Sequence, residues 1–485
     1  MSVPESRILR GIPYVTGAAS ATLLSADLEL SFWGGVDPKT GEIIDRFHPL
    51  SGCWLKDTIL AIPGGRGSCG GSVIMMELIL NGLGPKALIF QRREEIITLG
   101  VMVAEELFNK TAAVVTLNPV DFCQVLDWNG KTVHVLGGQV SDAPLNDSTA
   151  NKAVEPAIDI NTLETRLSDT DRAMLDGANG EAARISLKII IRMADMMGAP
   201  ELMDVSQAHA DAAWYGPGSV AFGQRLRAWG GRLLVPTTIN SLNVDQKRWR
   251  ALGVNAEFGS ACDELAKAFV DMGARFHSPA RHTYLRLPLS SVIQSLGALI
   301  ALTGRAPKAG VYVDENRLAS VWLRVTPPRG IDDSFWPILG YALGAIAMTR
   351  IPVITGLENL KPNDDNFKAF SAAFATSSSA PMFHMVNLTP EAPTFESVCP
   401  HGVILEAFDV DWKHLEAIWD KFNHGSKPRE IDLISFGNPH FSFQEIKEVS
   451  KLCQGRTKKG DVAVVVTCGR AQYGLASQAG YIEEL

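Results

Sequence analysis

Cysteine pairs, long apolar runs and an excess of positive charge are all lacking in this sequence. Seven cysteines are scattered along 485 residues, and none of them forms a Cys-x-x-Cys pair. In a chain of this length that pattern disfavours a disulfide framework and a metal site built by neighbouring residues, although ligands from distant segments remain open. A reducing compartment fits this pattern best, so we expect a cytoplasmic protein.

The most apolar segments are too short to cross a membrane. They lie around Ser291–Thr303 and Ile338–Met348 and are interrupted by glycines, and both are well below the ~18 residues of a spanning helix. The first residues, MSVPESRILRGIPYV, lack the continuous apolar stretch of a secretory signal. We therefore expect core helices at both segments, no export and no membrane partner.

Basic residues are in deficit. The 45 Lys and Arg residues against 53 Asp and Glu residues give a formal net charge of -8, which leaves no basic field to collect phosphate backbones. We therefore expect no nucleic acid partner. The 46% hydrophobic content is typical of a globular chain with two or three domains, and no repeat of 20 to 50 residues indicates a solenoid.

Short strand patterns alternate with helical patterns, which predicts an α/β fold. The segment Gln139–Asn161 is polar and without periodicity, which predicts a linker. We therefore expect one domain over residues 1–150 and another over residues 151–485. The predicted strands are Ile59–Pro63, Ala87–Gln91, Ala112–Leu117, Thr132–Leu136, Arg232–Pro236, Ile431–Phe436 and Ala463–Thr467. The predicted helices are Val73–Asn81, Glu94–Phe108, Glu181–Met197, Val220–Trp229, Cys262–Met272 and Phe443–Cys453.

A glycine-rich segment, Pro63–Ser72, joins a predicted strand to a predicted helix. Its backbone N–H groups and the helix start favour a bound carboxylate or phosphate. Arg66 could clamp such an anion, and Ser68 and Ser72 lie where an alkoxide is stabilised. The absence of a Lys-Ser/Thr pair argues against a nucleotide-binding loop, and a tight turn with capping serines is the alternative.

A second polar cluster lies between Asp204 and Gly218. Ser206, His209, Asp211 and Tyr215 concentrate four proton-handling or hydrogen-bonding groups in this short stretch. Sites often form on polar loops beside a rigid scaffold. A solvated loop with a satisfied histidine is the alternative.

Three further segments combine turn residues or charges. Pro236–Asn240 comes at the end of a predicted strand, the edge where α/β sheets place ligands. In Phe436–His440, which also follows a predicted strand, Asn438 and His440 could point at a substrate, and ordinary turn chemistry is the alternative in both cases. Asp314–Arg317 is typical of a solvated face or an ion pair.

Together these segments resemble the aconitase X family, in the form that fuses a swivel domain ahead of the catalytic domain. The resemblance implies an N-terminal swivel β/α domain in residues 1–150 and a larger layered α/β aconitase-like catalytic domain in residues 151–485. It also implies a lyase, a hydro-lyase that dehydrates a small hydroxy acid. The matching segments occur in the family's order and are Phe32–Gly41, Gly65–Ser72, Glu94–Ile97, Ser206–Asp211, Val235–Asn240, Asp314–Arg317 and Ser435–His440.

The resemblance implies roles for individual residues. Ser68 matches the family's proton-accepting serine, and Arg66 beside it would stabilise negative charge. At position 438 this chain carries asparagine, which resembles the family members that act on cis-3-hydroxy-L-proline. A cysteine at this position is typical of mevalonate 5-phosphate dehydratases. We therefore expect cis-3-hydroxy-L-proline to become pyrroline-2-carboxylate; another hydroxy acid such as mevalonate 5-phosphate, or a non-catalytic family member, is the alternative. The candidate substrate contacts are Gly67, Ser72, Ser206, His209, Asp211, Thr238, Asn240, Asn438 and His440.

The resemblance also implies an iron-sulfur cluster, whose matching cysteines are absent here. Where the family carries a Thr-Cys-x-Pro-Tyr motif, this chain reads Arg275–Tyr284, and a family segment is missing between Tyr284 and Thr303. Relatives continue past Leu485 through a cysteine-containing strand and a helix. We therefore expect an incomplete catalytic domain with metal ligands unassigned and no other cofactor. The sequence does not fix the oligomeric state.

Overall fold

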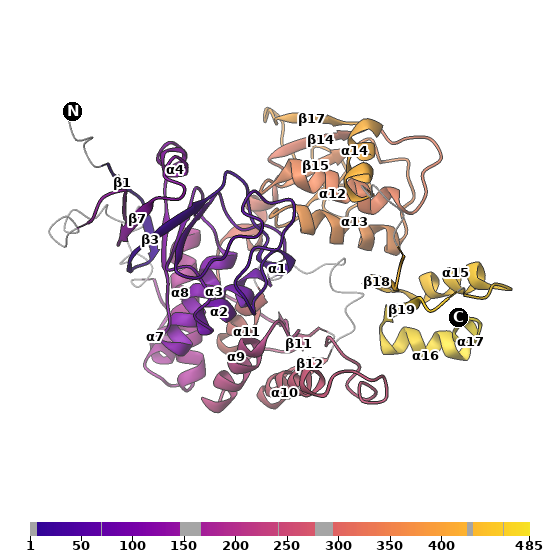
Figure 1. The fold of residues 1–485 in the computed structure, drawn as a ribbon, viewed down its shortest axis with the longest axis horizontal. Helices are drawn as coiled ribbons and strands as arrows, with labels where there is room; N and C mark the ends of the chain where they lie inside the picture. The colour runs from indigo at the N-terminus through magenta and orange to yellow at the C-terminus, as the bar shows by residue number, and fades with distance from the viewer. Residues whose placement is uncertain are drawn as a thin grey trace. The chain divides into compact units, whose positions relative to one another are not determined.

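The computed structural model describes residues 7–68, 70–145, 166–240, 242–276, 294–423, 430–458 and 460–485. The described residues up to 316 form one compact unit, and those from 317 onward form another (Figure 1).

An eight-stranded mixed sheet is the scaffold of the first unit. The strand order is β1-β8-β7-β3-β4-β5-β6-β2. The central strands β3 to β6 are parallel, and the strands on either side of them are antiparallel. The strands are β1 (Ile8–Arg10), β2 (Ile12–Val15), β3 (Ala18–Ser25), β4 (Thr58–Ile62), β5 (Ala87–Phe90), β6 (Ala113–Thr116), β7 (Thr132–Leu136) and β8 (Gln139–Ser141).

Helices cover both faces of this sheet, which explains why β4 and β5 are apolar at nearly every position. Leu60 belongs to the core beneath α2 (Gly71–Leu80) and α3 (Ile96–Phe108). Its neighbour Ile59 points the other way, into a core shared with α4 (Pro119–Leu126). A short helix, α1 (Phe32–Gly35), lies between β3 and β4 in the sequence.

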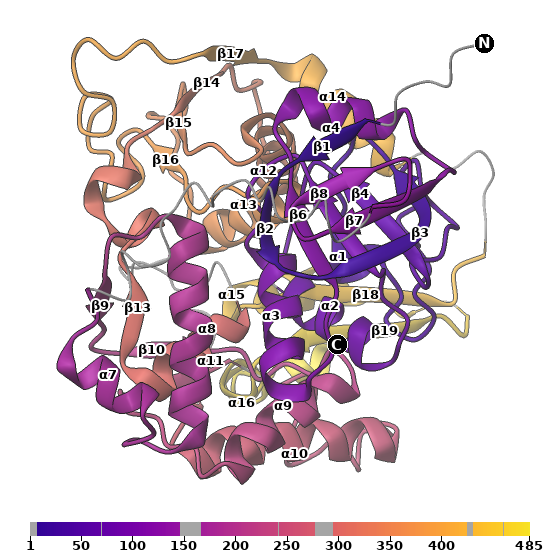
Figure 2. The ribbon, with the colours of Figure 1, turned by 90° about the vertical axis from the view of Figure 1, so that its left-hand side faces the viewer.

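The rest of the first unit packs directly on this sheet domain, because one core cluster contains residues of both. Arg192 of α8 pairs with Glu105 and Glu106 of α3, and Figure 2 shows the two helices side by side. A parallel sheet β10-β11-β12 and an antiparallel pair β13-β9 complete the unit. These elements are α7 (Asp169–Leu175), α8 (Glu181–Met197), β9 (Leu202–Asp204), β10 (Ala208–Ala210), α9 (Pro217–Ala228), β11 (Thr237–Ile239), α10 (Ala256–Met272), β12 (Arg275–Phe276), α11 (Gln294–Thr303), β13 (Arg305–Pro307), η3 (Gly310–Tyr312) and η4 (Asp314–Arg317).

The second unit combines a four-stranded parallel sheet, of order β16-β15-β14-β17, with a separate parallel pair β18-β19. Its aromatic core includes Phe335, Trp336, Phe370 and Phe374. The elements are β14 (Val321–Val325), α12 (Phe335–Ala347), β15 (Pro352–Thr355), α13 (Asp364–Ser377), β16 (His384–Met385), β17 (Ala407–Val410), α14 (Trp412–Phe422), β18 (Leu433–Phe441), α15 (Phe443–Cys453), β19 (Ala463–Cys468), α16 (Arg470–Gln478) and α17 (Tyr481–Glu484).

The predicted α/β fold is confirmed, and helices α8 and α15 have the predicted bounds. The strand predicted at Arg232–Pro236 is wrong. There the N–H groups of Leu233 and Leu234 donate to Met272 and Ala301, and the strand β11 begins only at Thr237. The predicted linker begins too early, because β8 occupies Gln139–Ser141. Its part from 146 to 161, with the predicted domain boundary at 150, lies outside the described residues.

Within the described part of the chain, no helix combines the length and the apolar character needed to cross a bilayer.

Candidate active site

The loop between β4 and α2 holds the predicted catalytic serine at the start of a helix. The N–H of Gly70 donates to Ser68 Oγ over 3.2 Å, and the N–H of Gly71 donates to Ser68 O over 3.0 Å. Gly67 has φ +79°, a left-handed conformation that favours glycine. Ser72 is buried in the first turn of α2. N–H donation to Ser68 Oγ at a helix start stabilises the alkoxide form that a serine base needs.

Arg66 lies beside this serine with its guanidinium held in a fixed direction. Its Nη2 is 3.0 Å from Asp45 Oδ2, and its Nε donates to the carbonyl oxygen of Glu29 over 3.2 Å. Both side chains of the ion pair are largely buried. The structure therefore holds the predicted anion clamp through Asp45, a residue that the sequence interpretation missed.

A buried carboxylate supports the loop from the sheet side. Glu94 is 1% exposed and accepts the N–H groups of Ile96, Ile97 and Thr98 at the start of α3. A Cβ on Gly65 would lie 2.8 Å from Glu94 Oε1, so only glycine fits there. Burial raises the pKa of Glu94 to about 7, although the charge of Arg92 and the N–H donors oppose this shift.

Arg92, which follows β5, binds the same loop through hydrogen bonds. Its Nη2 is 2.7 Å from Glu29 Oε1 and 2.8 Å from the carbonyl oxygen of Gly65. From the sequence, Glu94 is recognised as the start of a predicted helix and as part of a family motif, whereas Arg92 and Glu29 are not recognised. One feature of the sequence could have identified these residues, namely that each is a charged residue close to the end of an otherwise apolar strand.

The second half of the site lies at the carboxyl ends of the parallel strands β10 and β11. Asp211 and Asn240 each follow their strand, and Asn240 Nδ2 donates to Asp211 Oδ1 over 2.5 Å. The N–H of Ala213 and the hydroxyl of Tyr215 also donate to this carboxylate, over 2.6 Å and 2.9 Å. Burial raises the pKa of Asp211, and these donors act in the opposite direction. The geometry thus suits Asp211 to holding Asn240 and Tyr215 in place.

The other predicted residues of this region are distributed along the strands. His209 and Thr238 face each other across β10 and β11, with His209 Nδ1 2.9 Å from Thr238 Oγ1. Ser206 is exposed and precedes β10, so the structure places it at the opposite end of that strand from Asp211. The segment predicted as one polar loop is therefore interrupted by a strand.

The two halves adjoin within the first unit. The rings of Trp33 and Tyr215 meet edge to face, with centroids 4.6 Å apart. Val73 and Met76 of α2 line a cavity of about 20 Å³ together with Asp211 and Tyr215. The start of α2, which follows Ser68 in the sequence, therefore packs against the loop that carries Asp211.

Asn438 and His440 belong to the second unit. The strand predicted to end at Phe436 continues as β18 to Phe441, with a shift in register after Phe436, so Asn438 and His440 lie within the strand and not in the simple turn that was the alternative. The carbonyl oxygen of His440 accepts from Lys368 Nζ over 3.1 Å. Burial, together with the charge of Lys368, lowers the pKa of His440.

The described residues do not supply a ligand set for the cluster that the resemblance implies. Among them, no group of three or more His, Cys, Asp or Glu side chains gathers in a way that could hold a metal ion. Cys262 is buried, and burial together with Asp263 raises its pKa to about 11, which opposes the thiolate form that binds metals. Burial likewise raises the pKa of Cys468. Cys69 lies outside the described residues.

Comparisons with known proteins agree with this architecture. Models of the aconitase X family match four segments, the swivel domain at 8–140, the first domain at 164–284, the second domain at 313–420 and the third domain at 431–485. The fold is similar to the crystal structure of Thermococcus kodakaraensis aconitase X in its holo form. That match has a TM-score of 0.55 and 23% identity, and it covers 66% of this chain and 85% of the other.

Two curated proteins are similar over nearly the whole chain. A cis-3-hydroxy-L-proline dehydratase from Hypocrea jecorina is 47% identical, covering 100% of this chain and 86% of the relative. Another from Pseudomonas aeruginosa is 39% identical, covering 97% of this chain and 85% of the relative. On this similarity, together with the four domain matches, the chain belongs to the aconitase X family.

Proposed function

We propose that this chain is a hydro-lyase that dehydrates cis-3-hydroxy-L-proline to pyrroline-2-carboxylate. The observation that carries the proposal is one hydrogen bond, in which the N–H of Gly70 at the start of α2 donates to Ser68 Oγ. Arg66 precedes Ser68 in the same loop, and Asp45 holds its guanidinium. The two relatives named cis-3-hydroxy-L-proline dehydratases support the choice of substrate.

The reaction removes one water from the substrate. Ser68 takes the proton from the carbon that bears the carboxylate, and the Cα–H electron pair forms the double bond as the neighbouring hydroxyl departs. The departing hydroxyl takes up one proton from solvent and leaves as water, and Ser68 afterwards releases to solvent the proton that it took. The resulting enamine tautomerises to the cyclic imine. Arg66 and the N–H groups at the helix start stabilise the negative charge that develops near the serine.

Asn240 and Tyr215 are the second set of groups that the geometry offers to the substrate. Asp211 orients both of them through hydrogen bonds. The second amide hydrogen of Asn240 can donate to a hydroxyl or carboxylate of a small ligand, and the phenol oxygen of Tyr215 can accept from a hydroxyl, at no cost in reorientation. Asp211 therefore acts through these two side chains.

The described residues gather no ligand set for an iron-sulfur cluster. The cluster stays a prediction of the resemblance, and quantification of iron and sulfide in the anaerobically purified protein tests it. No step of the reaction above depends on it.

Incubation of the anaerobically purified chain with cis-3-hydroxy-L-proline tests the proposal. The cyclic imine can be trapped and quantified. We expect Ser68→Ala to lower kcat by at least about 100-fold, the low end of what positioned general bases contribute. The control Ser477→Ala alters an exposed serine of α16 and leaves turnover unchanged. Turnover in Ser68→Ala equal to that of the unmodified chain would refute the role of Ser68, and absence of turnover in the unmodified chain would favour the non-catalytic alternative.

A further inference from the structure

Trp33 is an exposed aromatic residue beside the serine loop. Its side chain is 45% exposed, and it lies in the Phe32–Gly41 segment, for which the proposed reaction has no role. The N–H of Leu30 donates to Gly64, and the N–H of Arg66 donates to Leu30, which forms a parallel bridge between Leu30 and Gly65. The segments that contain Leu30 and Gly65 run in the same direction. Trp33 and Ser68 each lie three residues after the bridge, Trp33 in the first segment and Ser68 in the second.

The indole contacts one aromatic ring, and a hydrogen bond and a turn fix the backbone that carries it. Tyr215 meets its ring edge to face, with an interplanar angle of 80°. Ser31 Oγ donates to the carbonyl oxygen of Trp33 over 2.9 Å, and Gly34 turns the backbone with φ +77°. A Cβ on Gly71 would lie 3.6 Å from the Cβ of Phe32, which places the residue before Trp33 against the start of α2. The indole thus contacts the loop of Asp211, while its neighbour Phe32 lies against the start of α2, which follows Ser68.

Three carboxylates near the serine loop and Tyr215 are already engaged. Asp45 pairs with Arg66, Glu29 pairs with Arg92, and Asp211 accepts three donors. The proposed substrate carries a carboxylate and also a secondary ammonium inside a five-membered ring. Arg66 and the helix start suit the carboxylate, so the ammonium needs a partner of another kind. The face of a tryptophan ring binds cations and packs on apolar CH₂ groups alike.

We infer that the Trp33 indole, braced by Tyr215, receives the pyrrolidinium ring of the substrate and selects cyclic amino acids over hydroxy acids without a cationic nitrogen. This inference rests on the proposed function and adds the residue that recognises the amine. Trp33 contributes to binding in the ground state and the transition state alike, because the ammonium takes no part in the initial removal of the proton.

Replacement of Trp33 by leucine separates binding from chemistry. A cation–π contact of ~1–2 kcal/mol corresponds to about a 5- to 30-fold change in affinity, so Trp33→Leu raises KM by about that factor and leaves kcat nearly unchanged. Trp33→Phe keeps a ring face and shows a smaller rise. Trp54→Leu is the matched control, because Trp54 is 55% exposed on the same sheet domain. A fall in kcat in Trp33→Leu with KM unchanged would overturn the inference.

A ligand without the charge tests the recognition directly. The oxygen analogue cis-3-hydroxytetrahydrofuran-2-carboxylate retains the ring and carboxylate but has no ammonium. Calorimetry compares its Kd with that of cis-3-hydroxy-L-proline in the Ser68→Ala background, where substrate is not consumed. We expect the preference for the amine to shrink when Trp33→Leu is added. An unchanged preference would overturn the inference.

The binding measurement also distinguishes the two proposals. If the unmodified chain binds cis-3-hydroxy-L-proline through Trp33 but does not convert it, the inference stands and the proposed catalysis fails. If it converts the substrate while binding is independent of Trp33, the proposed function stands and the inference fails.

Discussion

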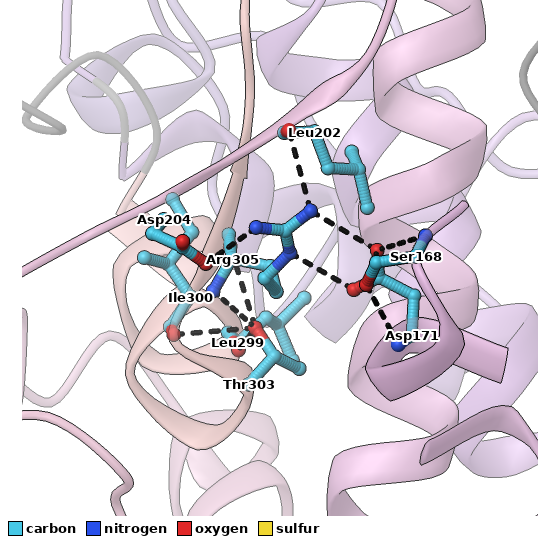
Figure 3. A network of polar contacts seen from close by, with 8 residues as sticks. All are labelled: Ser168, Asp171, Leu202, Asp204, Leu299, Ile300, Thr303 and Arg305. Carbon is cyan, nitrogen blue, oxygen red and sulfur yellow. Dashed lines mark hydrogen bonds and ion pairs between the residues drawn. The ribbon is translucent and has the colours of Figure 1, made fainter. Parts of the chain in front are cut away.

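Removing the buried partner of Arg305 will destabilise the first unit far more than removing its exposed partner. Arg305 of β13 binds two aspartates, as Figure 3 shows. Its Nε and Nη2 form a bidentate contact with Asp171 at 2.9 Å and 3.0 Å, while Nη1 binds Asp204. The Asp171 side chain is 0% exposed, whereas that of Asp204 is 91% exposed. One guanidinium thus offers a buried and a solvated ion pair for comparison.

The magnitudes follow from burial. Asp171→Asn leaves an arginine without its buried counter-charge, a type of change that costs about 3–5 kcal/mol. It also disturbs the capping box, in which Asp171 Oδ2 accepts from the N–H and the hydroxyl of Ser168 at the start of α7. Asp204→Asn removes an exposed pair and costs at most about 1 kcal/mol. In melting temperature, Asp171→Asn corresponds to a fall of roughly 5–8 °C in a unit of about 300 residues.

Thermal and urea unfolding, followed by circular dichroism, measure both variants against the unmodified chain. Raising the salt concentration weakens only the contribution of the exposed pair. Equal destabilisation by Asp171→Asn and Asp204→Asn would refute the argument, because it would mean that burial does not decide the strength of these pairs.

Three further changes have defined outcomes. Gly297→Ala places a Cβ about 2.2 Å from the carbonyl oxygen of His209 and costs about 1–3 kcal/mol; in the control Gly474→Ala, where the Cβ meets open space, stability is unchanged or rises. Lys368→Met removes the positive charge that, after burial, lowers the pKa of His440, so an NMR titration shows this pKa rising; an unchanged titration would remove Lys368 as a cause. Burial raises the pKa of Glu94 from 4.5 to about 7, so the stability that its protonated form contributes is complete below pH 4.5 and is lost as pH rises through 7. Urea unfolding across this range therefore depends less on pH in Glu94→Gln, and an equal dependence would contradict the shift.

The sequence predicts the elements of the first unit well where burial is continuous. Strands β4, β5, β6 and β7 and helix α3 all lie where apolar runs and flanking turn residues indicate them. Parallel strands covered on both faces appear in the sequence as continuous apolar runs, because apolar and polar residues do not alternate along them. Failures occur where pairing is decided by distant segments. The segment at Arg232–Pro236 is β-rich in composition, yet Leu233 and Leu234 bond to the ends of helices.

The serine loop is recognisable from sequence because its residues are consecutive. Its supports are not, since Glu29, Asp45 and Arg92 come from three different segments and reach the loop only through the sheet. Nothing local distinguishes Asp45 from a solvated aspartate. The same reason hides Trp33, whose role depends on the parallel bridge at Leu30 and on contact with Tyr215.

Asp211 illustrates how a residue type suggests chemistry that its surroundings redirect. An aspartate beside a histidine and a tyrosine in sequence indicates proton transfer, and Asp211 is accordingly predicted as a substrate contact. In the fold His209 points to Thr238, while both oxygens of Asp211 accept protein donors. A half-buried carboxylate that accepts three hydrogen bonds has little capacity to bind a further donor, but it fixes the direction of each donor that it holds. The position of Asp211 at the end of β10 therefore matters through Asn240 and Tyr215, and Tyr215 in turn fixes Trp33 beside the serine loop.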